Sequence, residues 1–167
     1  MTRDLSLGFR VSDEFIAQNP AVDASATEVS INLFATAELA FSRMESVLAP
    51  FGLSRGGFNL LQVVAGADEA LTPTQIGERI LVRAATVTGL VDTLVRRDLV
   101  ERRSDRDDRR RVLVSVTERG SEVIAAADAA IFDSDATIMA CLTRQERERL
   151  IRLLGKLQNQ LQELNNA

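Results

Sequence analysis

Two short helical patterns separated by only three residues constrain the fold of this chain more than any other feature of its sequence. The first pattern opens with Thr72 as N-cap, Pro73 at the first helical position and Gln75 completing a capping box. After residues 81–83, a second helical pattern starts at about Ala84. Two short helices joined by so tight a turn predict a helix-turn-helix.

The second of these helices has two faces of different character. Apolar side chains at positions 87, 90, 91 and 94 share one face and predict packing against a core. The opposite face carries small, hydroxyl or basic residues: Ala85, Thr86, Thr88, Gly89, Thr93 and Arg96. Such a face can approach the floor of a DNA major groove, where threonine methyl and hydroxyl groups contact base edges. Taken alone, it suits an ordinary surface helix equally well.

A β-hairpin is predicted directly after the helix pair. Residues 99–103 and 111–116 form its strands, because valines at 112, 114 and 116 alternate with other side chains. The tip, residues 104–110, mixes aspartates with arginines, which can brace one another and hold one guanidinium forward. A forward arginine suits the narrow, electronegative minor groove, so the hairpin is interpreted as a wing.

The net charge of −4 is divided unevenly along the chain. Between Arg83 and Arg111, nine arginines against six acids give +3, which leaves eleven basic and eighteen acidic residues elsewhere, or −7. A basic element on an acidic body is typical of a DNA reader, although a solvated charged hairpin explains the charge alone equally well. The candidate DNA contacts are Arg83, Ala85, Thr86, Thr88, Gly89, Thr93, Arg96, Arg106, Arg109 and Arg110.

A row of leucines follows a second capping box at Thr143 and Glu146. Its members recur at alternating four- and three-residue steps: Leu150, Leu154, Leu157, Leu161 and Leu164. Packing within one chain usually accounts for such a row. Long helices are also predicted over 27–48 and 118–131, and the leucine row lies after them. We therefore expect the row to bury against a second subunit. The expected parts are an arm with one short helix (1–26), a dimerisation region (27–53 and 121–167) and a winged domain (54–120).

Composition excludes several classes of function. The chain contains no histidine, so Ser-His-Asp catalysis, Cys-His catalysis and His-ligated zinc are excluded. No constellation of acids suggests carboxylate catalysis, so we expect no enzyme activity, metal or cofactor. Without a predicted signal peptide or membrane span, a cytoplasmic location is expected. The lone Cys141 is interpreted as a buried structural thiol, with an oxidant sensor as the alternative.

From about Leu33 to Leu164 the sequence resembles the MarR family of bacterial transcriptional regulators. The motifs, in order, are Leu71-Thr72, Val87-Thr88, Val91-Asp92-x-Leu94, Leu99-Val100, Arg103-x-Asp105-x-x-Asp108-Arg109-Arg110 and Thr117-x-x-Gly120. Three positions depart from the family pattern. Gly89 stands where relatives often have arginine, Arg83 replaces a capping serine or aspartate, and Asp98 replaces a glycine. Aspartate tolerates the left-handed conformation, so we expect Asp98 to preserve the turn.

The resemblance implies a mainly α fold with a small β-hairpin wing (α+β) and N- and C-terminal dimerisation helices. It implies a homodimeric repressor on a pseudo-palindromic operator of double-stranded DNA, with Arg109 in the minor groove, oriented by Asp105 and Asp108. The implied release signal is a small aromatic or phenolic effector. Its candidate pocket residues, Phe34, Phe41, Arg43 and Met44, are better explained as core residues or surface charge. The alternative function is a dimer that binds DNA without sequence choice or contacts other proteins.

Overall fold

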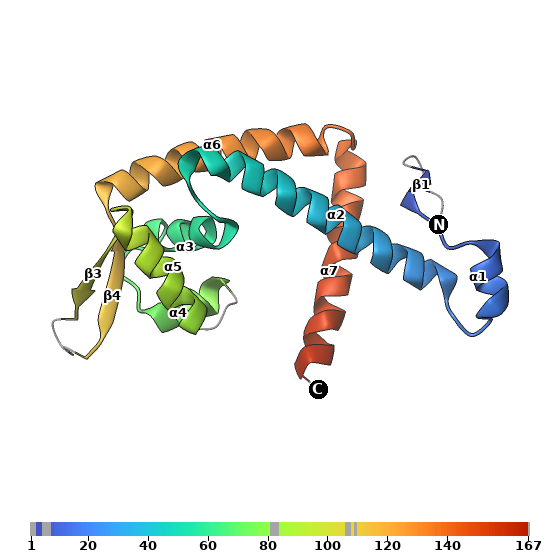
Figure 1. The fold of residues 1–167 in the computed structure, drawn as a ribbon, viewed down its shortest axis with the longest axis horizontal. Coiled ribbons are helices and arrows are strands. Elements are labelled where there is room, and N and C mark those ends of the chain that lie inside the picture. Colours follow the sequence, from blue (N-terminus) through green and yellow to red (C-terminus); the bar gives the residue numbers. More distant parts are fainter. Residues whose placement is uncertain (1–2, 5–7, 81–83, 106–107, 109, 167) are drawn as a thin grey trace.

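The computed structural model describes residues 3–4, 8–80, 84–105, 108 and 110–166 (Figure 1). The fold is mostly helical with a two-stranded antiparallel wing, which confirms the predicted class. In chain order the elements are β1 (Arg3–Asp4), β2 (Gly8–Phe9), α1 (Asp13–Gln18), α2 (Ala24–Leu48), the 3-10 helix η1 (Ala49–Phe51), α3 (Arg55–Ala65), α4 (Pro73–Ile80), α5 (Ala84–Arg96), β3 (Val100–Ser104), β4 (Val112–Val116), α6 (Glu118–Met139) and α7 (Arg144–Asn166).

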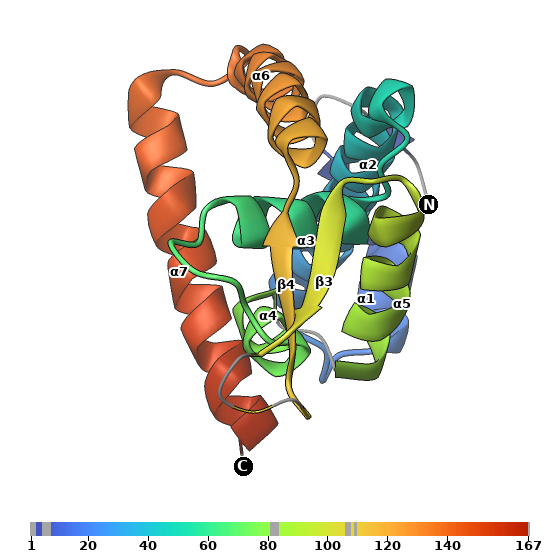
Figure 2. The ribbon, with the colours of Figure 1, turned by 90° about the vertical axis from the view of Figure 1, so that its left-hand side faces the viewer.

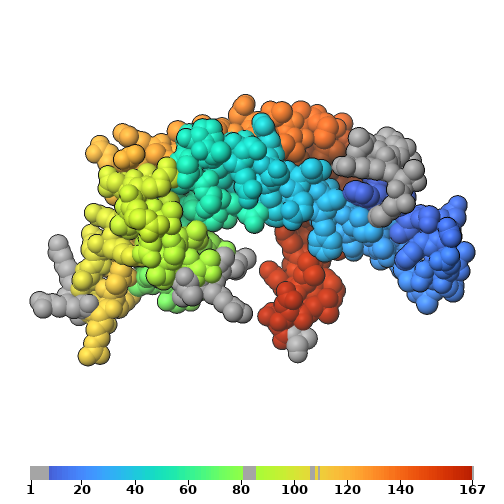
Figure 3. All heavy atoms as spheres, viewed as in Figure 1, coloured from blue at the N-terminus to red at the C-terminus, as the bar shows by residue number. Residues whose placement is uncertain are grey.

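Two long helices, α2 and α6, lie side by side and carry the winged part at one end (Figure 1). The winged part consists of α3, α4, α5 and the hairpin β3–β4, which stands beside α5 (Figure 2). Helix α7 projects from the other end of α6 (Figures 1 and 3). In the part of the chain described here, no helix is long and apolar enough to cross a membrane.

One hydrophobic core joins the winged part to the long helices. Its side chains come from α3, α4, α5 and both strands, and α2 and α6 add Leu48 and Ile124. Leu71, in the loop before α4, pairs with Val114 of β4 through backbone hydrogen bonds of 2.8 and 3.0 Å. The loop therefore docks α4 on the wing strand, and burial of this shared core holds the winged part as one unit.

The predicted helix caps are confirmed. In the first capping box the Thr72 amide donates to Gln75 Oε1 (2.9 Å) and the Gln75 amide donates to Thr72 Oγ1 (3.3 Å). In the second, the Thr143 amide donates to Glu146 Oε2 (2.8 Å), a bond that lowers the pKa of Glu146. A side-chain cap typically stabilises its helix by about 1 kcal/mol.

Two helix boundaries differ from the predictions. Helix α6 continues to Met139 instead of ending at Ile131, because no glycine or proline interrupts the chain before Thr143. Helix α2 begins at Ala24 instead of Thr27, because the Asp23 carboxylate caps the amides of residues 25 and 26. Hydrogen bonds with Ser25 and Ala26 lower the pKa of Asp23.

The N-terminal arm contains the predicted short helix, α1, and a small β1–β2 hairpin that was not predicted. The side chain of Asn32 in α2 bonds both backbone groups of Phe9 in the arm. It donates to the Phe9 carbonyl (2.9 Å) and accepts from the Phe9 amide (2.8 Å). Glu28 accepts from Arg10 (2.5 Å) and from the Val11 amide (3.1 Å), and these contacts lower its pKa. The arm is thus attached to α2 by side-chain contacts.

Candidate nucleic-acid interface

Helix α5 presents the polar face that its sequence predicted. Val87 and Val91 are fully buried (0% exposed) beneath the helix. On the opposite side, the exposed residues are Thr86, Thr88, Gly89, Thr93 and Arg96. Ala85 lies in the first turn of α5, but its side chain and all of Arg83 lie outside the described residues. The packing of the helix therefore determines which side is free for a partner.

The middle of this face has no side chain, because Gly89 lies there. Hydrogen bonds within the helix order the residues at its C-terminal end. A Cβ atom added to Gly89 would meet nothing within 4 Å, so packing within the chain does not require glycine there. Thr93 Oγ1 donates to the Gly89 carbonyl (3.0 Å) and accepts from the Arg96 guanidinium (3.1 Å). Thr93 therefore holds Arg96 along the helix.

The described residues of the wing tip are ordered by both predicted aspartates. Asp108 Oδ1 accepts from the Arg110 amide (3.0 Å), and the Arg111 amide donates to the Asp108 carbonyl (2.8 Å). The Asp105 carboxylate lies 3.6 Å from the Arg111 guanidinium. Arg110 is exposed, whereas Arg106 and Arg109 lie outside the described residues. Both aspartates bind within the tip, and their action on Arg109 stays a prediction.

Arg102 is a residue of this surface that was not predicted. From β3, its Nη1 lies 2.6 Å from Asp92 Oδ1 of α5, and its Nη2 donates to the Thr88 carbonyl at 3.4 Å. Two-residue alternation along the strand puts Arg102 on the same face as the buried Val100. This alternation is the sequence signal that could have identified Arg102, because it places the arginine on the side of β3 that faces α5.

The leucine row of α7 remains largely uncovered within one chain. Leu157 is 39% exposed and Leu161 is 55% exposed, and Leu150 and Leu164 are also exposed, while Leu154 is half-buried. Between α2 and α7 lies an apolar groove of about 600 Å³, lined by residues that include Leu33, Ala37, Leu150, Leu154 and Leu157. One apolar surface therefore runs from the groove along α7.

The four candidate effector residues do not gather in one cavity. Phe34 is 69% exposed, and the guanidinium of Arg55 lies 3.8 Å from the ring centroid of Phe41. Arg43 Nε donates to Ser134 Oγ (3.3 Å), and Met44 packs against the core. None of them lines either pocket described here. Only Met44 therefore fits the expected core role, since both aromatic rings lie on the surface.

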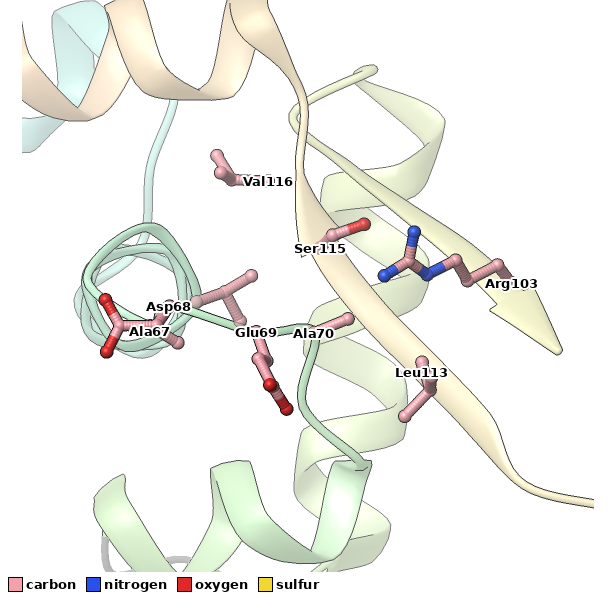
Figure 4. A pocket seen from close by; sticks show the side chains of 9 residues that line it. Ala67, Asp68, Glu69, Ala70, Arg103, Leu113, Ser115 and Val116 are labelled. Carbon is pink, nitrogen blue, oxygen red and sulfur yellow. The ribbon is translucent and has the colours of Figure 1, made fainter. Parts of the chain in front are cut away.

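The second pocket, of about 470 Å³, lies between the α3–α4 loop and the wing (Figure 4). Its lining side chains include Asp68 and Glu69 from the loop and Arg103, Leu113 and Ser115 from the hairpin. It therefore lies apart from the exposed face of α5.

The prediction that Cys141 is a buried structural thiol is wrong. It is exposed in the turn between α6 and α7, and its Sγ donates to the Ile138 carbonyl at 3.4 Å. The turn lies at the end of α6, where the chain bends sharply into α7 (Figure 1), so neighbouring helices do not enclose it.

Comparison with known proteins gives a consistent result. A model of the MarR family matches residues 51–111. The chain is 31% identical to the HTH-type transcriptional repressor YetL of Bacillus subtilis (strain 168) over 137 residues, which cover 81% of this chain and 82% of YetL. It is 25% identical to the HTH-type transcriptional regulator PecS of Dickeya dadantii (strain 3937), over 71% of this chain and 72% of PecS.

Solved structures share the fold. An S. aureus MepR–DNA complex superposes with a TM-score of 0.72 at 21% identity, covering 78% of this chain and 96% of that one. The repressor CouR, bound to a 23-mer DNA duplex, gives 0.69 at 21% identity, covering 75% and 88%. With the family match on the winged part and a relative similar over most of its length, this chain belongs to the MarR family of transcriptional regulators.

Proposed function

We propose that the chain is a repressor that binds a pseudo-palindromic DNA operator as a homodimer, with α5 in the major groove and the wing in the minor groove. The observation that carries the proposal is the exposed face of α5, which has small or hydroxyl side chains at 86, 88, 89 and 93 and lies beside a wing joined to it by Arg102. Relatives support it, since YetL is named a repressor and MepR and CouR were solved with DNA.

Specific contacts are assigned on this basis. Thr86, Thr88 and Gly89 would face base edges, while Thr93 positions Arg96 toward the phosphates. The other assigned contacts are Arg83, Ala85, Arg106, Arg109 and Arg110, of which Arg109 is proposed for the minor groove. The basic segment supplies a local +3 on a body of −7, which directs DNA to this end of the molecule.

The dimer is proposed from the uncovered leucine row. A monomer that left this row and the α2–α7 groove in water would expose a continuous apolar surface. Burying it against a second copy makes residues 27–53 and 121–167 the dimerisation region, and residues 54–120 remain the reading domain. The two α5 helices would then reach half-sites about 34–36 Å apart, one turn of DNA.

A small aromatic or phenolic effector remains part of the proposal, as does a cytoplasmic location, where the DNA of a bacterial cell lies. Enrichment of random duplexes on the purified protein, followed by sequencing, tests the operator. We expect a pseudo-palindrome whose half-site centres lie about 10 base pairs apart. An unenriched pool from bound DNA would favour a sequence-indifferent architectural role, and failure to retain any duplex would favour a protein-contact role.

A further inference from the structure

We infer that the turn Arg97–Leu99, which follows α5, couples the recognition helix to both long helices of the dimerisation region. Within it, Arg97 is a positioning residue that sets the angle of α5 and, through it, the operator spacing that the dimer accepts. This inference rests on the proposed function.

The first connection runs to the end of α2. Arg97 Nη2 donates to the Phe51 carbonyl at 2.8 Å, and Nη1 donates to the Gly52 carbonyl. Phe51 is the last residue of η1 and Gly52 is its C-cap, so these carbonyls lie at a helix end, where acceptors are left without partners and carry partial negative charge. A planar guanidinium can satisfy both acceptors at once. Arg97 thus joins α5 to the point where the chain leaves α2.

Gly52 makes room for this contact. Its φ of 63° lies in the left-handed region, and a Cβ atom there would lie 2.5 Å from Arg97 Nη2. A larger residue would therefore be strained and would also displace the guanidinium. The glycine and the arginine form one junction, although 45 residues separate them.

The second connection runs to the start of α6. The Thr117 hydroxyl donates to the Asp98 carbonyl (2.7 Å), and the Thr117 amide donates to the Leu99 carbonyl (3.2 Å). The same hydroxyl accepts from the Gly120 amide (2.9 Å) as the cap of α6. A Cβ atom on Gly120 would lie 1.9 Å from the Leu99 carbonyl oxygen, so the backbones meet directly.

Backbone hydrogen bonds hold the turn against the last turn of α5. Asp98 adopts the left-handed conformation (φ 57°), and its amide donates to the Val95 carbonyl at 2.9 Å. The Leu99 amide donates to the Leu94 carbonyl at 3.0 Å, and the Leu99 side chain is buried. The turn is bonded on one side to η1, which directly follows α2, and on the other side to the N-cap of α6. A relative movement of α2 and α6 must therefore move the end of α5.

The inference predicts an altered spacing preference when Arg97 is replaced. Two operators are prepared, one with the spacing preferred by the wild-type protein and one shortened by a base pair, and binding to both is measured at one salt concentration. We expect the wild type to favour its spacing by about tenfold, an ordinary magnitude for coupled sites. Arg97→Met should reduce that ratio to about threefold or less, because the winged part can then tilt.

Arg103→Met is the matched control, because it removes one positive charge from the same segment without touching the junction. It should lower both affinities and keep their ratio. Arg97→Lys keeps the charge but lacks the planar fork, so it should also flatten the preference, and it carries the test if Arg97→Met folds poorly. A wild-type ratio retained in both Arg97 variants overturns the inference. A wild type that binds no operator contradicts the proposed function itself, and the inference with it.

Discussion

Asp92 and Arg102 illustrate, at the scale of single residues, why counting arginines overstates how many can bind phosphate. Arg102 contacts Asp92 and the Thr88 carbonyl, and Arg97 contacts two carbonyls at the end of η1. Neither was among the predicted DNA contacts. Arg102 joins β3 to α5 within the winged part, and Arg97 joins α5 to the segment that follows α2. Arginines of the basic segment thus also hold the reading surface in shape.

Replacing Asp92 separates the two possible roles of Arg102. If Arg102 acts only by binding phosphate, Asp92→Asn frees it, adds net positive charge and tightens binding. If the pair positions the wing, Asp92→Asn weakens specific binding, and we expect a loss of about tenfold, or ~1.4 kcal/mol. Fluorescence anisotropy measures the affinity of the variant for the operator and for a scrambled duplex. Tighter operator binding would exclude the positioning role.

Gly89 should show opposite effects on stability and on DNA binding. A methyl group at this position meets no atom of the chain, and alanine is the better helix former. Gly89→Ala should therefore raise the free energy of unfolding by about 0.4–1 kcal/mol. Operator affinity should fall, because the added methyl group approaches the DNA. Urea unfolding and anisotropy provide the two readouts. Unchanged affinity would mean that Gly89 does not face the groove.

Glu28 makes the attachment of the arm dependent on pH. The Arg10 guanidinium beside it, and the Val11 amide, hold the pKa of Glu28 below its usual value of 4.5. A carboxylate whose pKa is lowered by folding stabilises the folded state above its unfolded pKa, and this contribution is lost as pH falls through the lowered value. The arm should therefore stay attached at neutral pH and loosen only in acid.

The Val11 amide reports this titration directly in proton–nitrogen NMR spectra, since it donates to Glu28. Its midpoint should lie below 4.5, and Glu28→Gln should abolish it. A midpoint at the ordinary value would show that the contact with Arg10 does not form in solution.

At the scale of elements, the sequence predicted what depends on near neighbours. Both capping boxes join residues three positions apart, and the two faces of α5 follow from helical periodicity. The end of α6 was placed too early, since no local signal marked Ile131 as a boundary. The contact of Phe9 with Asn32 and the Arg97 junction join partners 23 and 45 residues apart, which a single sequence does not reveal.

Helix α7 allows a direct test of the dimer. Leu161 is 55% exposed in one chain, so Leu161→Glu should leave the winged part folded. Placed in a subunit interface, the charge should instead produce monomers. Operator affinity should then fall about 10²-fold or more, because the two half-sites no longer act together. Gln160→Glu adds the same charge at the adjacent position, outside the leucine row. Sedimentation showing a Leu161→Glu dimer would remove α7 from the interface.

On the scale of the whole molecule, the long helices and the winged part have different tasks. Helices α2 and α6 connect the apolar α7 region with the basic reading surface, and the turn Arg97–Leu99 joins them to α5. The segment from Arg83 to Arg111 carries a net charge of +3, whereas the rest of the chain carries −7. A dimer would therefore present two separate basic surfaces, and its affinity for DNA should fall steeply as salt increases.

The measurement that tests the central claim most directly is the affinity and stoichiometry of the protein on its enriched site and on a scrambled duplex at one salt concentration. We predict two chains per duplex and an affinity for the site at least about 10³-fold higher than for the control. Equal affinities for the two duplexes, or one chain per site, would contradict the account of this protein as a dimeric operator-binding regulator.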